Sequence, residues 1–189
     1  MNFKRILITG APGTGKTAVI NALENAGFHC FHEVIRSMTL DAKTQQHPDT
    51  VLNNPIAFVS DSKRFNQQLL DARKQQFDHA INQEQAVVFY DRGMPDVLAY
   101  MDYFEQAYTS DFIHACKTNR YDAVFLLPPW EAIYVQDNER LETYPQATEI
   151  HEHLFKTYSS LGYDVMEVPF GTIAERLSFM LNHLDKAHA

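Results

Sequence analysis

The segment from Gly10 to Thr17 constrains this chain more than any other. It reads GAPGTGKT and lies between a short apolar run and a stretch of helical pattern. Gly10, Gly15, Lys16 and Thr17 occupy the fixed positions of a phosphate-binding loop, whose glycines let successive backbone N–H groups point at phosphate oxygens. The N-terminus of the following helix adds partial positive charge. Average composition gives this pattern in about one chain in a hundred of this length. The segment therefore predicts a nucleotide site.

The loop also predicts individual roles. We expect Lys16 to reach the β- and γ-phosphates of ATP, and the Thr17 hydroxyl to bind Mg²⁺. The residues expected to contact the nucleotide are Gly10, Ala11, Pro12, Gly13, Thr14, Gly15, Lys16, Thr17 and Ala18.

Apolar runs and helical patterns alternate along the chain. Runs typical of buried strands cover residues 3–9, 28–32, 86–90, 123–127 and 165–168, and helical patterns cover residues 17–26, 33–44, 56–83, 95–106, 109–117, 147–161 and 172–184. This alternation predicts an α/β fold in which helices cover both faces of a parallel sheet. The long pattern over 56–83 predicts a core stripe of Phe58, Phe65, Leu69, Phe77 and Ile81.

Asp91 follows the apolar run AVVFY at the predicted carboxyl end of a strand. Ligands of parallel sheets lie outside the carboxyl ends of the strands, so we expect Asp91 near the loop as a second Mg²⁺ ligand. The alternative is that Asp91 caps the helix that starts near Pro95. Arg92 completes the triplet DRG with Gly93 and is expected to clamp phosphate or substrate, the alternative being a surface ion pair.

Glu33 follows the second predicted strand at the same edge. Its carboxylate is a candidate base for an acceptor hydroxyl, although acidic residues are also favoured in the first turn of a helix. Arg36 lies one helical turn later and either orients Glu33 or is a solvated charge.

The polar segment QDNERLETYP, residues 136–145, has the profile of a lid over phosphates, within limits of about 129–146. Arg140 is its candidate for stabilising transition-state charge, and Asp137 is the other charged candidate; an ordinary exposed loop is the alternative. Trp130 either stacks on a base or anchors the lid. The segment RKQQ, from Arg73 to Gln76, has the character of a solvated helix face.

Composition excludes several classes of function. The 189 residues carry a formal net charge of −8, which disfavours general binding of nucleic acid or anionic membrane. Cys30 and Cys116 are too few for a disulfide framework and are expected to be reduced core thiols. The chain shows no signal-peptide pattern, membrane-span pattern, repeat or linker, so we expect one cytoplasmic domain of unknown oligomeric state.

The combination of GAPGTGKT, Glu33, the DRG triplet and a late D-x-x-R segment resembles the NadR-like AAA-type ATPases. These are kinase-like P-loop proteins, similar to the ribosylnicotinamide kinase domain and more distantly to thymidylate and deoxynucleoside kinases. The resemblance runs from Phe3 to about Leu184. It implies a three-layer αβα P-loop fold with five parallel strands in the order 2-3-1-4-5. It also places Glu33 where related nucleoside kinases keep their general base.

The sequence departs from neighbouring families at two points. Gly93 follows the Asp-Arg pair where thymidylate kinases carry a bulky residue. The third strand ends in Asp-Arg, not in the Asp-Glu of ring-forming AAA+ machines.

Three functions are consistent with these features. The first is a Mg²⁺-dependent kinase that phosphorylates a nucleoside, a nucleotide or a similar small molecule, with Lys16, Glu33, Asp91, Arg92 and Arg140 as its catalytic residues. The second is a regulatory ATPase or GTPase that acts on a protein partner, although no N-K-x-D guanine-reading motif is present. The third is a nucleic-acid end kinase, which the net charge disfavours.

Overall fold

The computed structural model describes residues 3–35, 62–134 and 142–186. Five strands form one parallel sheet in the order β2-β3-β1-β4-β5, which confirms the predicted fold class and strand order. The strands are β1 (Lys4–Gly10), β2 (His29–Phe31), β3 (Val87–Asp91), β4 (Ala123–Leu127) and β5 (Val165–Glu167).

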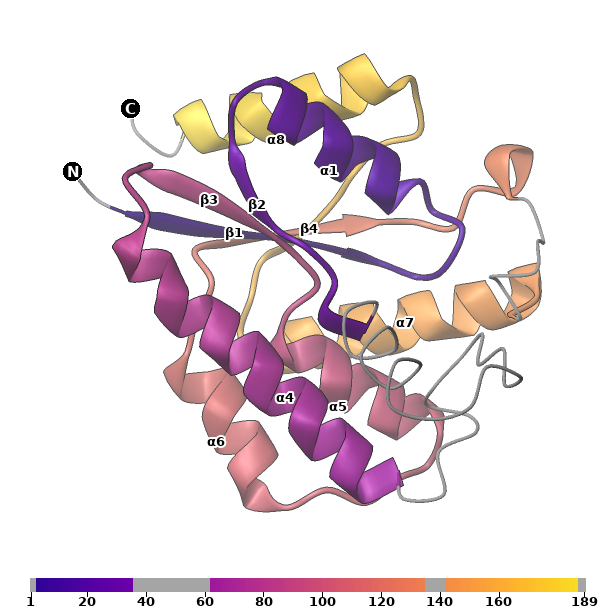
Figure 1. Cartoon of the computed structure of the whole chain (residues 1–189). Coiled ribbons are helices and arrows are strands. Elements are labelled where there is room, and N and C mark those ends of the chain that lie inside the picture. The colour runs from indigo at the N-terminus through magenta and orange to yellow at the C-terminus, as the bar shows by residue number, and fades with distance from the viewer. Residues whose placement is uncertain (1–2, 36–61, 135–141, 187–189) are drawn as a thin grey trace, which may run out of the picture.

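Helices cover both faces of this sheet (Figure 1). The first layer holds α1 (Lys16–Asn25) and α8 (Ile173–Lys186), and the second holds α4 (Ser62–His79), α5 (Met94–Tyr103), α6 (Ser110–Thr118) and α7 (Tyr144–Ser160). Two short 3₁₀ helices, η1 (Ala80–Asn82) and η2 (Glu131–Ile133), complete the elements. Among these helices, none is long and apolar enough to cross a membrane.

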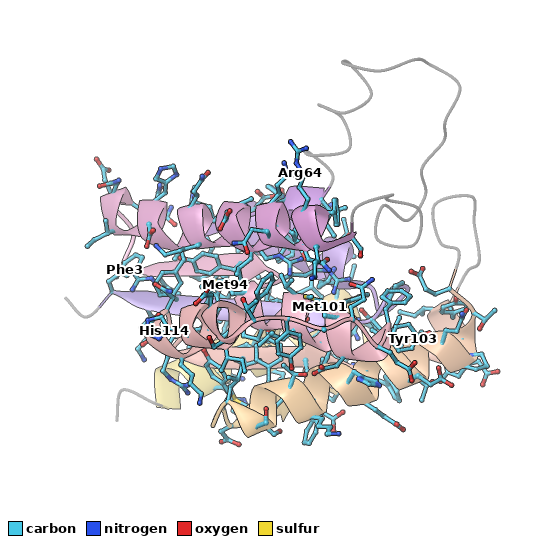
Figure 2. All side chains as sticks on the ribbon, turned by 90° about the horizontal axis from the view of Figure 1, so that it is seen from below. Phe3, Arg64, Met94, Met101, Tyr103 and His114 are labelled. Atoms are coloured by element: carbon cyan, nitrogen blue, oxygen red, sulfur yellow. The ribbon has the colours of Figure 1, made fainter. Side chains whose placement is uncertain are left out.

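The side chains of the central strands alternate between two cores. Phe89 and Phe125 pack with the residues of α1 and α8, whereas Tyr90 and Leu126 pack with the residues of the second layer. Figure 2 shows Met94 and Met101 of α5 within the second layer, where both are buried. It also shows Arg64 near the N-terminal end of α4.

Both cysteines are buried and free, as predicted. Burial raises the pKa of the Cys30 thiol and of the Cys116 thiol to about 12. The two thiols are therefore neutral core groups with little nucleophilic character at neutral pH.

The long helix differs from its prediction in two respects. Phe65, Leu69 and Phe77 of the expected core stripe are buried, but Ile81 lies in η1 and is 73% exposed, because the α-helix ends at His79. Phe58 and all of the predicted helix 33–44 beyond Ile35, including Arg36, lie outside the described residues.

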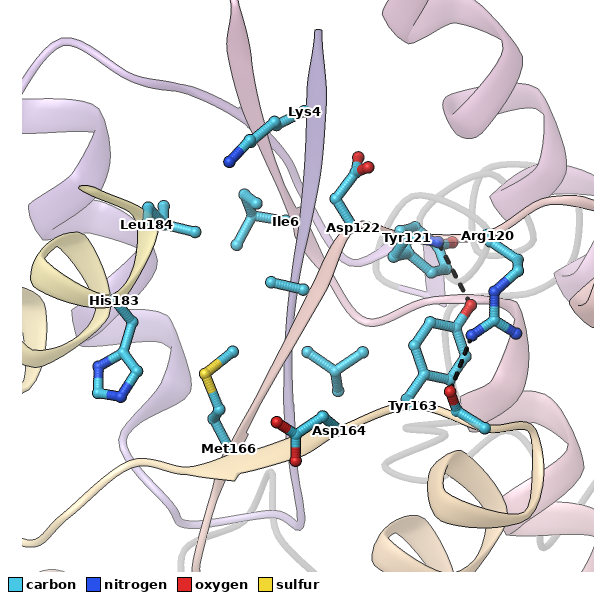
Figure 3. Close-up of a pocket in the computed structure, with 13 residues that line it drawn as sticks. Lys4, Ile6, Arg120, Tyr121, Asp122, Tyr163, Asp164, Met166, His183 and Leu184 are labelled. Carbon is cyan, nitrogen blue, oxygen red and sulfur yellow. Dashed lines mark hydrogen bonds between the residues drawn. The ribbon is translucent and has the colours of Figure 1, made fainter. Parts of the chain in front are cut away.

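The register of the sheet determines where the site forms. Ile8 of β1 pairs with Asp91 of β3, and Gly10 pairs with Leu127 of β4. The carboxyl ends of three adjacent strands therefore meet at one edge, beside the start of α1. A cavity of about 540 Å³ lies at the other end of the strands, between Lys4, Asp122, Asp164 and His183 (Figure 3). None of the predicted site residues lines it.

Candidate functional site

The loop between β1 and α1 gathers backbone N–H groups at the start of the helix. Gly13 and Gly15 have left-handed φ values of 79° and 81°, which an L side chain rarely adopts. The Gly15 carbonyl accepts the first helical hydrogen bond from Ala18 N at 3.1 Å, and the Thr14 hydroxyl donates to the Ala11 carbonyl at 3.0 Å. Hydrogen bonds within the loop therefore fix its conformation. A loop of this shape at a helix N-terminus suits an anion, because its backbone N–H groups are available as donors.

Lys16 reaches across the sheet edge to Asp91. Its Nζ lies 3.0 Å from Asp91 Oδ1, and the two side chains are only 12% and 8% exposed. Asp91 does not cap the following helix: Gly93 occupies the N-cap position of α5. The two residues that the sequence assigned to phosphate and metal binding therefore lie together, Lys16 at the start of α1 and Asp91 at the end of β3.

The donor set at this point fits a magnesium ion. Thr17 offers a hydroxyl oxygen and Asp91 a carboxylate, and Mg²⁺ prefers such hard oxygen ligands together with phosphate oxygens. Thr17 is exposed in the first turn of α1.

Glu33 lies between two buried arginines at the same edge. Its Oε2 is 2.5 Å from Arg92 Nε, and its Oε1 accepts a hydrogen bond of 2.9 Å from Arg73 Nη2. The Glu33 side chain remains 11% exposed, so it is held in place but accessible. A carboxylate fixed in this way is suited to accept a proton from a bound hydroxyl.

Arg73 corrects the prediction of a solvated RKQQ face. It is 3% exposed, and its Nη1 donates to the Gly93 carbonyl at 2.9 Å while Nη2 holds Glu33. A signal was present in the sequence, because Arg73 stands four residues after Leu69 and four before Phe77, inside the apolar stripe. Burial alone would lower the pKa of Arg73, but the carboxylates of Glu33 and Asp96 raise it above its ordinary value.

Asp96 is a second residue that the sequence prediction missed. It is fully buried in the first turn of α5 and accepts hydrogen bonds from the Thr9 hydroxyl (2.5 Å), from Gly93 N (2.9 Å) and from the Tyr158 hydroxyl. Its Oδ1 also lies 3.2 Å from Arg92 Nη1. Asp96 therefore joins β1, α5 and α7 to the DRG turn. An acidic residue three positions after an N-cap glycine was the available sequence signal.

The DRG turn itself is tightly constrained. Arg92 has a φ of 70°, which is unusual for a residue other than glycine, and its backbone N–H donates to the Ile8 carbonyl at 2.9 Å. A Cβ on Gly93 would lie 2.7 Å from a methyl carbon of Leu7 and 2.8 Å from the ring of Tyr121. Glycine is thus required here for the close approach of the turn to the core. Arg92 itself is 8% exposed, so its ion pairs with Glu33 and Asp96 are buried and do not lie at the surface.

Aromatic and apolar side chains border the loop on the α8 side. Trp130 stacks on Phe170 with ring centroids 5.2 Å apart, and Phe170 is 55% exposed. Ile133 and Ile173 are also exposed large apolar residues. Ile133 lies next to the loop, because a Cβ on Gly15 would be 3.4 Å from its Cδ1.

Two residues within the limits of the predicted lid, Tyr134 and Glu142, meet next to the loop. The Tyr134 hydroxyl donates to the Glu142 carbonyl, and a Cβ on Gly13 would lie 2.7 Å from the Tyr134 ring. Tyr134 also packs against Tyr144, at 5.5 Å between ring centroids. Asp137 and Arg140 lie outside the described residues.

Comparison with protein families supports this description. The model of a family described as an AAA domain matches residues 5–176. The chain belongs to this AAA domain family. The predicted family resemblance is thereby confirmed over most of the chain. Among curated protein sequences, no relative matches it.

Solved structures similar to this AAA domain show the same fold at low sequence identity. A deoxyadenosine kinase from M. mycoides with bound dATP is 14% identical, with a TM-score of 0.63 over 96% of this chain and 99% of that chain. A thymidylate kinase from Candida albicans is 13% identical, with a TM-score of 0.69 over 99% and 93%. A NadR protein in complex with NR is 16% identical, with a TM-score of 0.69 over 97% of this chain but only 51% of that one. The chain spans about half the length of that NadR protein.

Proposed function

We propose that this AAA domain is a Mg²⁺-dependent kinase that transfers the γ-phosphoryl group of ATP to a hydroxyl of a nucleoside, a nucleotide or a similar small molecule. One observation carries the proposal: Glu33, a carboxylate held by two buried guanidinium groups, lies at the same sheet edge as the Lys16–Asp91 pair. A carboxylate held at this edge can take the proton of an acceptor hydroxyl, and detection of a phosphorylated product separates this role from the activation of water. The fold shared with nucleoside and nucleotide kinases supports the same assignment.

The donor side consists of the loop, Lys16, Thr17 and Asp91. The backbone N–H groups of the loop bind the phosphates, and Lys16 leaves Asp91 to contact the β- and γ-phosphates. Thr17 and Asp91 would hold Mg²⁺, which when bound neutralises charge between the β- and γ-phosphates. Lys16 and the loop keep the γ-phosphoryl group in line with the acceptor.

The acceptor side is built around Glu33. The acceptor oxygen forms a bond to the γ-phosphorus as the bond from that phosphorus to the β,γ-bridging oxygen breaks, and ADP leaves. The hydroxyl proton passes to Glu33 and then to water. Arg92, beside Glu33, offsets the negative charge on the transferred group. Arg140 is proposed to add charge from the lid.

Replacing Glu33 by glutamine tests this assignment, because the substitution keeps the shape and removes the base. In a product-detecting assay with ATP, Mg²⁺ and an accepted substrate, we expect E33Q to lose about 10²- to 10⁴-fold in kcat. The KM for ATP should change little. Glu84, an exposed residue before β3, provides the matched control as E84Q. If kcat of E33Q equals that of the wild type, Glu33 is not the general base.

A further inference from the structure

Arg176 is a buried cation in direct contact with the phosphate-binding loop. It lies in the first turn of α8, is 2% exposed, and donates from Nη1 to the Thr14 carbonyl at 3.0 Å. A Cβ on Gly15 would lie 3.0 Å from the same nitrogen. One peptide group, between Thr14 and Gly15, therefore separates the guanidinium from the N–H groups that face the nucleotide.

Arg176 differs from the other buried arginines of the site in having no counter-ion among the residues that the structure describes. Within the described part of the chain, its Nε and Nη2 are buried without a hydrogen-bond partner, and no carboxylate lies within ion-pair distance. Burial alone would lower the pKa of Arg73 and of Arg92. Neighbouring carboxylates, preceded for Arg92 by the hydroxyl of Tyr100, instead raise both pKa values above the ordinary value. Burial instead lowers the pKa of Arg176, and no neighbouring carboxylate compensates.

The remaining contacts of Arg176 do not account for a buried charge. Its guanidinium carbon lies 5.7 Å from the centre of the Trp130 ring, near the outer limit for a cation–π interaction. One hydrogen bond to a carbonyl needs only a neutral donor. A buried charge is costly unless it is paired, so a site that keeps one without a protein carboxylate is suited to an anion that arrives with a ligand.

We propose that Arg176 is the protein's counter-charge for the phosphate groups of the bound nucleotide, acting across the Thr14–Gly15 peptide. The inference rests on the proposed function only in requiring that the loop bind nucleotide. Because the guanidinium is shielded from solvent, its attraction for phosphate is weakly screened. The attraction should increase with the charge of the ligand, so that ATP depends on Arg176 more than ADP, and ADP more than AMP.

A purely structural role makes a different prediction. If Arg176 only fastened α8 to the loop, its loss would lower the stability of the nucleotide-free protein. It would also lower the affinity for ATP, ADP and AMP by a similar factor. If Arg176 is a counter-charge, its loss removes an unpaired buried cation from the free protein. The free protein should then be as stable as the wild type or more so, and only the binding of phosphates should suffer.

The experiment compares R176M, R176K and R120M by calorimetric titration with ATP, ADP and AMP and by thermal unfolding without nucleotide. Arg120 is the matched control, since it also donates to backbone carbonyls, of Leu161 and Gly162, and lies on an aromatic ring, but at the opposite end of the sheet. In R176M we expect the Kd for ATP to rise roughly tenfold or more, with a smaller rise for ADP and little change for AMP. The Tm should be unchanged or higher. R176K should retain most of the ATP affinity, and R120M should bind all three as the wild type does.

The counter-charge role would be overturned if R176M raised the Kd for ATP, ADP and AMP by the same factor. It would also be overturned if R176M had a lower Tm and no loss of affinity that increased with the charge of the nucleotide. If the wild type binds ATP and R176M binds it equally well, the role of Arg176 is overturned and the proposed function is not. If the wild type binds no nucleotide, both the role of Arg176 and the proposed function are overturned.

Discussion

Arg73 shows how a single residue can organise the site. It occupies one position of an apolar helical stripe, and its two terminal nitrogens hold Glu33 and the Gly93 carbonyl. Periodicity predicts which face of the helix is buried, but it does not show whether a charge on that face has a partner. Glu33 lies 40 residues earlier in the chain, and only the fold brings the two together.

Replacing Arg73 should damage the chemical step more than nucleotide binding. In R73M, Glu33 loses one of its two fixed partners, so we expect kcat to fall about 100-fold while the KM for ATP stays within about threefold. R73K should recover part of kcat, because it restores a donor to Glu33. Steady-state kinetics with an accepted substrate checks this. K74M, at the exposed neighbouring position, is the control and should behave as the wild type. A rise in the KM for ATP with unchanged kcat would contradict the role.

At the scale of elements, the sequence predicted the order and type of the strands and helices well. The apolar runs were sufficient to predict the central strands β1, β3 and β4, because helices bury these strands from both sides. The DRG turn was less predictable. Its alternative interpretation placed Asp91 at the helix N-cap, whereas Gly93 is there and Asp96 holds its N–H. Asp96 draws its partners from Thr9 and Tyr158, residues 87 and 62 positions away, which no local pattern indicates.

Replacing Asp96 should therefore loosen several elements at once. D96N removes the charge that faces Arg92. It also leaves at least one of the four hydrogen-bond donors to Asp96 without its acceptor. We expect the free energy of unfolding to fall by about 3–5 kcal/mol, the usual cost of breaking a buried pair from one side. Urea denaturation measures the change. D111N, on the exposed face of α6, should cost less than about 1 kcal/mol. Similar stability of D96N and D111N would show that the network is not structural.

At the scale of the whole molecule, charge is distributed unevenly. The formal net charge is −8, yet Lys16, Arg73, Arg92 and Arg176 are concentrated at the carboxyl edge of the sheet. Composition does not show that three of these four cations have protein carboxylates as partners. The identity of the acceptor also depends on contacts that the sequence does not encode as a motif.

The buried tyrosines and cysteines make the fold sensitive to alkali. Burial raises the pKa of Tyr121 and Tyr158 well above 10.0, that of Tyr100 to about 12, and that of both cysteines from 9.0 to about 12. The folded state therefore favours the neutral acids, and their contribution is fully present below the pKa of the unfolded groups. It is lost as the pH rises through about 9 toward 12. We expect the free energy of unfolding, measured in urea, to be flat from pH 7.5 to about 9 and to fall by pH 10.5. A constant value up to pH 10.5 would contradict this account.

The most direct test of the central claim is the detection of a phosphorylated product. Purified protein would be incubated with ATP and Mg²⁺, alone and with a panel of nucleosides, nucleotides and ribosylnicotinamide, and both ADP and phosphorylated acceptor would be quantified. The account predicts that one class of acceptor raises ADP release sharply with matching product. K16A should lose this activity while keeping the circular dichroism spectrum of the wild type. Slow ADP release that no acceptor changes, or full activity in K16A, would contradict the account, and the first of these would favour a nucleotide switch that acts on a protein partner.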